Sequence, residues 1–380
     1  MLADDIRALA GKIESRRGLP ADLIGRLRAE GLFSLALPRS LGGRECTPRE
    51  IVATVAELSA ADASTGWTVL IGQGSGFLAW MEPAAAKQIV GLTPDPVVAS
   101  SMAPLGAGQE ITLEDGRPGY RLSGRWPMTS GSEHCDWLMC TFDVVHGDGA
   151  PVLGPGDRPV RRMAFVPAAE VRVLDTWTAT GLRGTGSHDV EVDAVEVPHE
   201  RTIDPFSTPP REPGPLYATS FFAFLMVCMA GFPLGVAQRA LEELVATART
   251  KRRAGGGDLM AADPTVQVAV FRSATALRAA RALVDTALGD MATAVEETGS
   301  APPAVRARLA GAVVHAMSTA RAVVDDAFHR CGASALYLDK PLQRCFRDIH
   351  TAAQHVAFGP AATERLGRVE LGLPVPEFLL

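Results

Sequence analysis

The sequence lacks the short motifs that identify the commonest hydrolases and nucleotide-binding enzymes. None of its segments matches HExxH, GxSxG or the P-loop pattern. Its eight histidines do not cluster with acidic residues at the spacing of metal ligands. A zinc peptidase, a serine hydrolase of the nucleophile-elbow type and a P-loop NTPase are therefore not indicated, and we expect no metal site.

Signs of disulfide chemistry and of secretion are also missing. The six cysteines form no CxxC pair and no zinc-finger spacing, which is typical of free thiols in a cytoplasmic protein. The first stretch, MLADDIRALAGKIESRR, is acidic and then amphipathic, without the basic start and apolar centre of a secretory signal. We expect a cytoplasmic protein.

The chain has no excess of positive charge. Its 37 Lys and Arg residues against 43 Asp and Glu residues give a net charge of −6, and no basic tract is interleaved with aromatic residues. We therefore expect no nucleic-acid partner. The length of 380 residues, with 47 % hydrophobic and 21 % charged residues, suits a soluble globular protein of two or three domains.

One apolar run, residues 218–237, is about as long as a membrane-spanning helix. It stands alone, lacks basic flanks and contains Gly231 and Pro233. A helix buried on all sides of a bundle shows the same composition. We expect a buried core helix here, and no membrane partner.

The periodicity divides the chain into three regions. Residues 1–95 show apolar positions at helical spacing, and Thr47 to Glu50 has the capping-box pattern that starts a helix. Short alternating runs separated by Gly, Pro and Asp fill residues 96–205 and indicate an antiparallel β domain. Helical periodicity returns in residues 206–380, with breaks near 255–257, 302–303 and 332, which indicates a bundle of about four helices. The expected fold class is α+β, mainly α.

A glycine-rich segment, Gly181 to Gly186, superficially resembles a dinucleotide-binding motif. That motif needs a strand before it and a helix after it, whereas SHDVEVDAVEVP follows here and alternates like a strand. We interpret the segment as a β turn, with Arg183 and His188 exposed or packing locally.

Residues 123–137 are the most informative stretch. A strand start with Trp126 is followed by Thr129, Ser130 and a glycine. A hydroxyl and backbone N–H groups beside a glycine can donate to a flat, polar-edged ring at close range. The alternative is an ordinary strand and turn with a tryptophan packed under it.

A second stretch, residues 341–358, carries polar residues in an apolar helical pattern. If it is one helix, Arg344, Asp348 and His355 fall on one stripe. His355 could then face a site and act as a general base, or it could be a core histidine satisfied by a neighbour.

Two further polar features have ordinary explanations that compete with a functional one. Gln73 reads as a surface or satisfied core glutamine. Arg249 and Arg252 precede a glycine run at a helix end, where basic residues complement the helix dipole, although guanidinium groups also bind phosphate.

Taken together, six segments give the sequence a family resemblance. The order of domains resembles the acyl-CoA dehydrogenase fold, and the details are similar to the two-component (group D) flavin-dependent monooxygenases. The segments are LPADLIGRLRAEGLFSLALPRSLGG, AADASTGW, LSGRWPMTSGSEHCDW, DTWTATGLRGTGSHDVEVDAVEVP, ADPTVQ and PLQRCFRDIHTAAQH. Where the dehydrogenases often carry a catalytic glutamate, this chain reads Gln354-His355-Val356-Ala357, which argues against acyl-CoA dehydrogenation.

The resemblance implies roles for residues near the flavin ring. Ser130 matches the hydroxyl near flavin N5 that stabilises a C4a-hydroperoxide, and His355 matches a histidine facing flavin and substrate. Ser101 and Met102 match the part of the β domain that lies along the ring. The cofactor site is expected to include Trp126 and Thr129 as well.

The resemblance also implies roles further from the ring. Arg249 and Arg252 match a segment that reaches a flavin phosphate, in the same or a neighbouring subunit. Gln73 lies near the place of a substrate-side histidine. The segment 331–337 departs from the glycine-rich segment that dehydrogenases use for the adenine end, which fits FMN at least as well as FAD. Aromatic residues that could wall an apolar substrate pocket, a pattern that a core helix also gives, are Tyr217, Phe221 and Phe224.

The resemblance therefore predicts the oxygenase component of a two-component flavin-dependent monooxygenase. It would take reduced FMN or FAD, with FMN slightly favoured, from a separate reductase, because the chain shows no nicotinamide-binding unit. With O2 it would hydroxylate a hydrophobic, aromatic or amine small molecule, in natural-product biosynthesis or aromatic degradation. The family implies a homotetramer built as a dimer of dimers. Two alternatives stay open: an acyl-CoA dehydrogenase-like desaturase, and a non-catalytic homologue without flavin.

Overall fold

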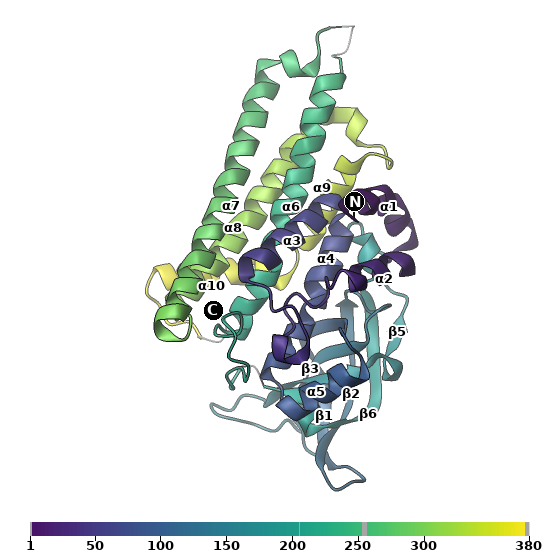
Figure 1. The fold of residues 1–380 in the computed structure, drawn as a ribbon, viewed down its shortest axis with the longest axis vertical. Coiled ribbons are helices and arrows are strands. Elements are labelled where there is room, and N and C mark those ends of the chain that lie inside the picture. The colour runs from purple at the N-terminus through teal and green to yellow at the C-terminus, as the bar shows by residue number, and fades with distance from the viewer. Residues whose placement is uncertain (1, 205, 253–256, 377–379) are drawn as a thin grey trace.

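A computed structural model describes residues 2–204, 206–252, 257–376 and 380. Gly255 and Gly256, within one of the helix breaks expected from the sequence, lie outside the described residues. Figure 1 shows an elongated molecule in which a bundle of long helices rises from a β-sheet, with the first helices packed between the two.

The N-terminal region is helical, as the periodicity indicated. Thr47 and Glu50 form the expected capping box: the Thr47 side chain accepts from the Glu50 N–H, and the Glu50 carboxylate accepts from the Thr47 N–H at 2.7 Å. The buried carboxylate of Asp62 caps the next helix by accepting from the Thr65 N–H at 2.8 Å. The helices are α1 (Leu2–Arg16), α2 (Ala21–Ala29), α3 (Pro48–Ala61), α4 (Ala63–Gly72) and α5 (Pro83–Leu92).

The central region is one seven-stranded sheet with the order β5-β6-β2-β1-β3-β4-β7. All neighbouring pairs are antiparallel except β1 and β3, which are parallel. The antiparallel β domain expected from the sequence is confirmed with this one exception. The strands are β1 (Val98–Thr112), β2 (Pro118–Thr129), β3 (Trp137–Val145), β4 (Arg161–Pro167), β5 (Arg172–Leu174), β6 (His188–Pro198) and β7 (Thr202–Ile203).

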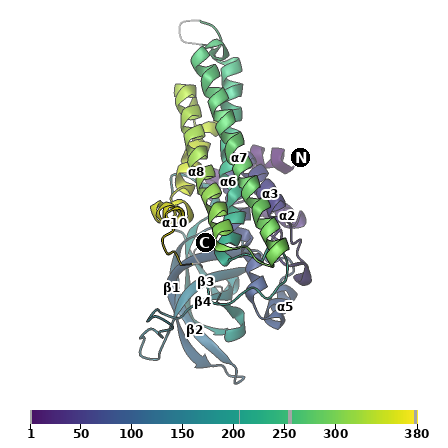
Figure 2. The same cartoon turned by 90° about the vertical axis from the view of Figure 1, so that its left-hand side faces the viewer.

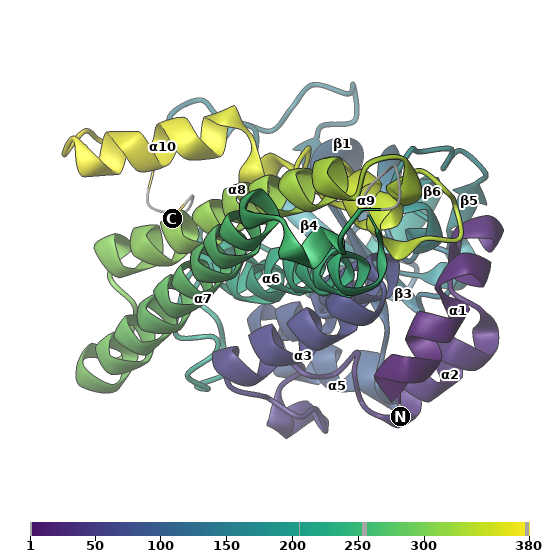
Figure 3. The ribbon, with the colours of Figure 1, turned by 90° about the horizontal axis from the view of Figure 1, so that it is seen from above.

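Among the described residues, the C-terminal region forms three long α-helices and two shorter ones. The long helices run side by side (Figures 1 and 2). Seen from above, α10 lies outside α8, on the edge of the molecule away from α1 and α2 (Figure 3). The expected order of N-terminal helices, central β-sheet and C-terminal helical bundle is confirmed. The helices are α6 (Phe221–Thr250), α7 (Pro264–Thr298), α8 (Pro303–Cys331), α9 (Pro341–Ala352) and α10 (Pro360–Glu370).

Helix α6 contains the apolar run noted in the sequence. By length and composition it could cross a membrane, but 83 % of its most apolar window is buried inside the protein. That burial accounts for its apolar character, because a helix surrounded by other helices needs no polar face.

Helices α3 and α6 approach each other closely at two glycines, Gly231 and Gly235. A Cβ on Gly231 would lie 2.3 Å from the Val52 carbonyl oxygen, and one on Gly235 would lie 2.2 Å from the Ala56 carbonyl oxygen. Both distances are far below van der Waals contact, so the backbones could not stay this close with any larger residue.

We therefore expect Gly235→Ala to lower the free energy of unfolding by about 1–3 kcal/mol, because the helices must separate. Gly311, inside α8, is the matched control because a Cβ there would meet nothing within 4 Å. Gly311→Ala should instead raise the stability by roughly 0.5–1 kcal/mol. Urea unfolding of both variants measures the difference; equal stabilities would contradict a close contact between α3 and α6.

Candidate functional site

Ser130 lies where β2 leaves the sheet. Between Trp126 and Thr129 the register of β2 against β6 shifts, and Met128 adopts a φ of 55°. Gly131, at φ 77°, then turns the chain, and its N–H donates to the Thr185 carbonyl at 3.0 Å. A bulge of this kind redirects the side chains that follow it. It brings the Ser130 hydroxyl beside the segment that precedes β6.

Four buried groups form a continuous chain of hydrogen bonds at this point. The Trp67 indole N–H donates to Ser130 Oγ at 3.0 Å, and Ser130 Oγ lies 2.7 Å from Ser187 Oγ. Ser187 Oγ lies 2.6 Å from Thr185 Oγ1, which donates to the Leu182 carbonyl at 2.8 Å. The chain therefore joins α4, the end of β2 and the glycine-rich segment.

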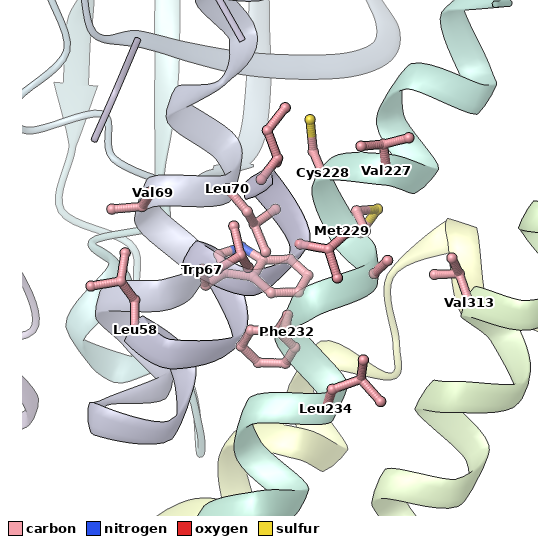
Figure 4. Packing of buried hydrophobic residues seen from close by; sticks show 14 of the residues in the cluster. Leu58, Trp67, Val69, Leu70, Val227, Cys228, Met229, Phe232, Leu234 and Val313 are labelled. Carbon is pink, nitrogen blue, oxygen red and sulfur yellow. The ribbon is translucent and has the colours of Figure 1, made fainter. Parts of the chain in front are cut away.

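Trp67 also connects Ser130 to His355. The indole ring meets the Phe232 ring edge-on, with centroids 5.0 Å apart, and Figure 4 shows the two side chains facing each other between α4 and α6. The His355 ring lies 5.8 Å from Trp67 at an interplanar angle of 70°. The two residues that the sequence suggested as catalytic thus contact one tryptophan.

The single helix expected over residues 341–358 is wrong, because α9 ends at Ala352. His355 instead caps a short 3₁₀ turn, Val356–Phe358, and its Nδ1 accepts from the Ala357 N–H at 3.2 Å. Burial lowers the pKa of His355 to about 4, so the ring is neutral at neutral pH. With Nδ1 accepting, the proton lies on Nε2, which can only donate.

Two buried polar atoms beside Gly131 have no hydrogen-bond partner among the described residues: Thr68 Oγ1 and His134 Nε2. A Cβ on Gly131 would lie 3.3 Å from His134 Nε2 and 3.8 Å from Thr68 Cγ2. Burial lowers the pKa of His134 to about 4 as well. Buried polar groups normally find partners, so unpaired ones mark a place where a polar ligand or water belongs.

These groups fit the polar edge of a flavin ring. Ser130 and His355 offer uncharged donors and acceptors, and Thr68 and His134, beside Gly131, have unpaired ones. The ring of a flavin is flat and carries several heteroatoms that need such partners. A set of uncharged donors and acceptors of this kind suits a flavin ring.

The charged residues of α9 lie behind this site. Arg344 Nε donates to the Glu14 carboxylate at 2.9 Å, which joins α9 to α1. Asp348 Oδ1 accepts from the Leu182 N–H at 2.6 Å and so holds the segment that carries Thr185 and Ser187. Burial raises the pKa of Asp348 to about 7.

Ser101 and Met102 lie at a large irregularity of β1. Register with β3 is lost between Ser101 and Gly106, so residues 102–105 have no partners in that strand pair. The Ser101 carbonyl accepts from Thr141 Oγ1 at 3.2 Å, and Met102 is half-buried. Backbone groups outside a ladder are free to contact a ligand.

Trp126 does not join the Ser130 group. Its ring is fully buried against Gly106 and Gly124, and its indole N–H donates to the Thr141 carbonyl at 2.9 Å. It belongs to a cluster within the β domain that is separate from the one containing Trp67. Thr129 is also fully buried, and its hydroxyl donates to the Trp126 carbonyl at 3.3 Å. In the structure both residues support the strand.

Gln73 is a core glutamine whose side-chain hydrogen bonds are satisfied, which is the ordinary alternative that we considered from the sequence. Its Oε1 accepts from the Ala36 N–H at 3.0 Å, and its Nε2 donates to the Leu32 and Val69 carbonyls at 2.8 and 2.9 Å. Both amide donors are occupied, so contact with a substrate would require breaking these bonds.

The aromatic residues chosen as a substrate wall pack against one another. Tyr217, Phe221 and Phe224 are all buried, and the Tyr217 hydroxyl donates to the Ala36 carbonyl at 2.7 Å. Phe77 stacks on Phe221 with ring centroids 4.5 Å apart. These contacts correspond to the alternative interpretation, in which the aromatic residues belong to a core helix.

Arg249 and Arg252 are exposed at the end of α6. Figure 1 shows that the C-terminal end of α6 lies at the end of the bundle remote from the sheet. Within one chain these arginines therefore do not join the Ser130 group.

The sequence reading missed Trp67, Ser187 and Thr185 as parts of the site. AADASTGW is one of the segments that carry the family resemblance, and the glycine-rich segment is interpreted from the sequence as a β turn, but neither pattern assigns these residues to the site. No local pattern marks these residues, because their contacts link positions 63 and 57 residues apart along the chain.

The N-terminal domain model of the acyl-CoA dehydrogenases matches residues 1–86, and their C-terminal domain model matches residues 227–360. Indole-3-acetate monooxygenase from Pseudomonas putida is 30 % identical over 98 % of this chain and 92 % of that protein. The oxygenase component of the FADH2-dependent resorcinol hydroxylase from a Rhizobium species is 32 % identical over the same shares. XiaF from a Streptomyces species, solved with FADH2 and glycerol, matches with a TM-score of 0.88 and 29 % identity over 97 % of this chain and 92 % of that one.

The fold and the two domain matches place the chain in the acyl-CoA dehydrogenase superfamily. Within it, the chain belongs to the family of flavin-dependent monooxygenases, as a relative of their oxygenase components. The relatives named above are monooxygenases or hydroxylases, so neither the desaturase nor the flavin-free alternative gains support.

Asp348→Asn tests whether burial raises the pKa of Asp348 in the folded protein. Between about pH 4 and pH 7 the folded protein keeps a proton on Asp348 that the unfolded chain releases, so this residue's contribution to stability falls as pH rises through that window. The asparagine cannot ionise, yet it keeps an oxygen for the Leu182 N–H. We expect the variant to match the wild type near pH 4 and to exceed it near pH 8 by an amount on the order of a few kcal/mol.

Urea unfolding of the pair at both pH values measures this difference, because other titrating groups are common to both proteins. A difference that does not change with pH would contradict a raised pKa for Asp348.

Proposed function

We propose that this chain is the oxygenase component of a two-component monooxygenase, which binds reduced flavin with the ring edge at Ser130 and hydroxylates a small aromatic molecule. The observation that carries the proposal is the contact of Ser130 and His355 with one buried tryptophan, in a site of uncharged polar groups. When bound, the reduced flavin would supply the activation of O2.

Ser130 would position the flavin. Its Oγ accepts from Trp67, and the next residue, Gly131, lies beside the unpaired Thr68 and His134 groups. Because all of these side chains belong to a packed core, their positions are fixed before the flavin binds. Preorganised groups of this kind stabilise charge that develops during a reaction without first having to reorient.

His355 would orient the substrate or the oxygen being transferred. From the sequence, His355 could be a general base or a core histidine satisfied by a neighbour. Since Nδ1 already accepts from the Ala357 N–H and the ring is neutral, the arrangement favours donation from Nε2–H over removal of a proton.

The substrate side of the site is proposed to be apolar and aromatic. The His355 ring lies next to the rings of Trp67 and Phe358. The next residue, Val356, is 70 % exposed, so an apolar side chain is accessible beside the histidine. The names of two relatives, which act on indole-3-acetate and resorcinol, support an aromatic substrate. The proposal includes an amine as a second class of substrate. It includes a role either in biosynthesis or in degradation.

Two observations bear on the choice of flavin. The departure of residues 331–337 from the dehydrogenase pattern favours FMN, whereas the relatives named with FADH2 favour FAD. Titrating the protein under anaerobic conditions with both reduced flavins, and comparing their dissociation constants, decides between them.

A separate reductase and a homotetramer are part of the proposal. The relative named as an oxygenase component supports a reductase partner. In a tetramer, Arg249 and Arg252 of one chain could reach the flavin phosphate of another, since they lie far from the Ser130 group of their own chain. Measuring the mass in solution tests this; a monomer would contradict it.

Stopped-flow mixing tests the oxygenase function itself. Protein loaded with reduced flavin and mixed with oxygenated buffer should show a near-ultraviolet absorbance that outlives the one seen with free flavin. Reoxidation at the rate of free flavin would contradict the proposal.

Two substitutions of His355 separate its roles. His355→Ala should lower turnover by roughly 10²-fold or more, because an aligned hydrogen-bond donor is lost, while flavin binding stays within a few fold. His355→Asn keeps an acceptor that can cap the 3₁₀ turn but removes the distal N–H. It should be as inactive as the alanine variant and more stable. An asparagine variant with full turnover would reduce His355 to a capping residue.

A further inference from the structure

The hydrogen-bond chain at Ser130 has two ends whose chemistry is fixed. At one end the Trp67 indole N–H, 3.0 Å from Ser130 Oγ, can only donate. At the other end the Leu182 carbonyl, 2.8 Å from Thr185 Oγ1, can only accept. Between them lie the three buried hydroxyls of Ser130, Ser187 and Thr185, and each has a single proton to donate.

These ends fix the direction of the whole chain. Because Thr185 gives its proton to the Leu182 carbonyl, it accepts from Ser187. Ser187 in turn accepts from Ser130. Ser130 therefore donates into the protein, and what it offers to a ligand is a lone pair. Aligned hydroxyls of this kind polarise one another, which strengthens the preferred direction.

The direction can be reversed, but one hydrogen bond is lost. The Leu182 carbonyl also accepts from the Trp177 indole N–H at 2.9 Å and from the Thr185 N–H at 3.1 Å, so it would keep partners without the Thr185 hydroxyl. In the reversed chain Thr185 donates to Ser187, Ser187 donates to Ser130, and Ser130 donates to the ligand. The bond from the Thr185 hydroxyl to Leu182 is then missing.

We propose that Ser187 and Thr185 act as positioning residues that make this site prefer reduced over oxidised flavin. The inference rests on the proposed function, in which the flavin edge near N5 lies at Ser130. N5 of an oxidised flavin is a hydrogen-bond acceptor, whereas N5 of a reduced flavin carries a proton and donates. The reduced ring donates to Ser130 and leaves the chain intact; the oxidised ring requires the reversed chain. The preference is worth one net hydrogen bond, or roughly a threefold to tenfold difference in affinity.

The direction of the hydrogen-bond chain also predicts the effect of removing one of its hydroxyls. In Ser187→Ala the Ser130 proton has no partner within the chain, so donating it to oxidised N5 no longer disrupts any bond. In Thr185→Val the Ser187 proton loses its acceptor and turns toward Ser130, which frees the Ser130 proton for the ligand. Either change should remove the advantage of the reduced flavin, although the two act at different points.

The test is an anaerobic titration of wild type, Ser187→Ala and Thr185→Val with oxidised and reduced FAD, repeated with FMN. The readout is the ratio of the two dissociation constants, measured by flavin absorbance and fluorescence without turnover. We expect the ratio to fall by roughly threefold to tenfold in both variants.

Two further variants serve as controls. Thr185→Ser keeps the hydroxyl and should keep the ratio of the wild type. Ser132 is the matched serine, since its hydroxyl is buried nearby but donates to the Gly186 carbonyl at 3.1 Å, outside the chain. Ser132→Ala should therefore also keep the ratio, although it removes one buried hydroxyl.

The outcomes separate this inference from the function on which it rests. A wild-type protein that binds neither flavin form would overturn both. Two results would overturn the inference and leave the proposed function standing. One is a wild-type protein that binds both flavin forms equally well. The other is a wild-type ratio of dissociation constants that stays unchanged in both Ser187→Ala and Thr185→Val. Thr185→Val alone decides the question if Ser187→Ala does not fold.

Discussion

The hydrogen bond from the Trp67 indole to Ser130 is the contact on which the rest of the site depends. Trp67 belongs to the N-terminal helices, Ser130 to the end of a central strand, and the rings of Phe232 and His355 pack on Trp67 from the C-terminal region. One buried side chain therefore sets the relative positions of all three regions at the site. A buried tryptophan needs a partner for its N–H, and Ser130 supplies it.

The side chains that hydrogen-bond to Ser130 Oγ, those of Trp67 and Ser187, are uncharged. His355 and His134 are neutral because burial lowers the pKa of each to about 4. The ionic contact of Arg344 with Glu14 ties α9 to α1, and Asp348 fixes the backbone of Leu182. Preorganised, uncharged donors and acceptors suit a flavin ring, because they need not reorient to pair with its heteroatoms.

Much of the fold could be predicted from the sequence, because it follows from local patterns. The capping box at Thr47, the alternation in the central strands and the apolar helix after Ser220 each appear where expected. Ser130 could be chosen because a hydroxyl beside a glycine at the end of a strand is a local signal. The fold then brings it together with His355.

Other features of the site could not be predicted, because they depend on tertiary contacts. Extending α9 to His355 was wrong, since the chain leaves the helix at Ala352 with no proline or glycine there to mark the end. The contact of Trp67 with Ser130 joins residues 63 positions apart, and no spacing rule reports such a pair. Gln73 looked available for a substrate only because its three backbone partners are invisible in the sequence.

The most direct test is a crystal structure of the protein soaked anaerobically with reduced FAD or FMN. The account predicts that flavin N5 lies about 3 Å from Ser130 Oγ, at hydrogen-bond distance, with His355 close to the ring. A flavin bound elsewhere, with Ser130 still enclosed between Trp67 and Ser187 and out of reach of the ring, would contradict it.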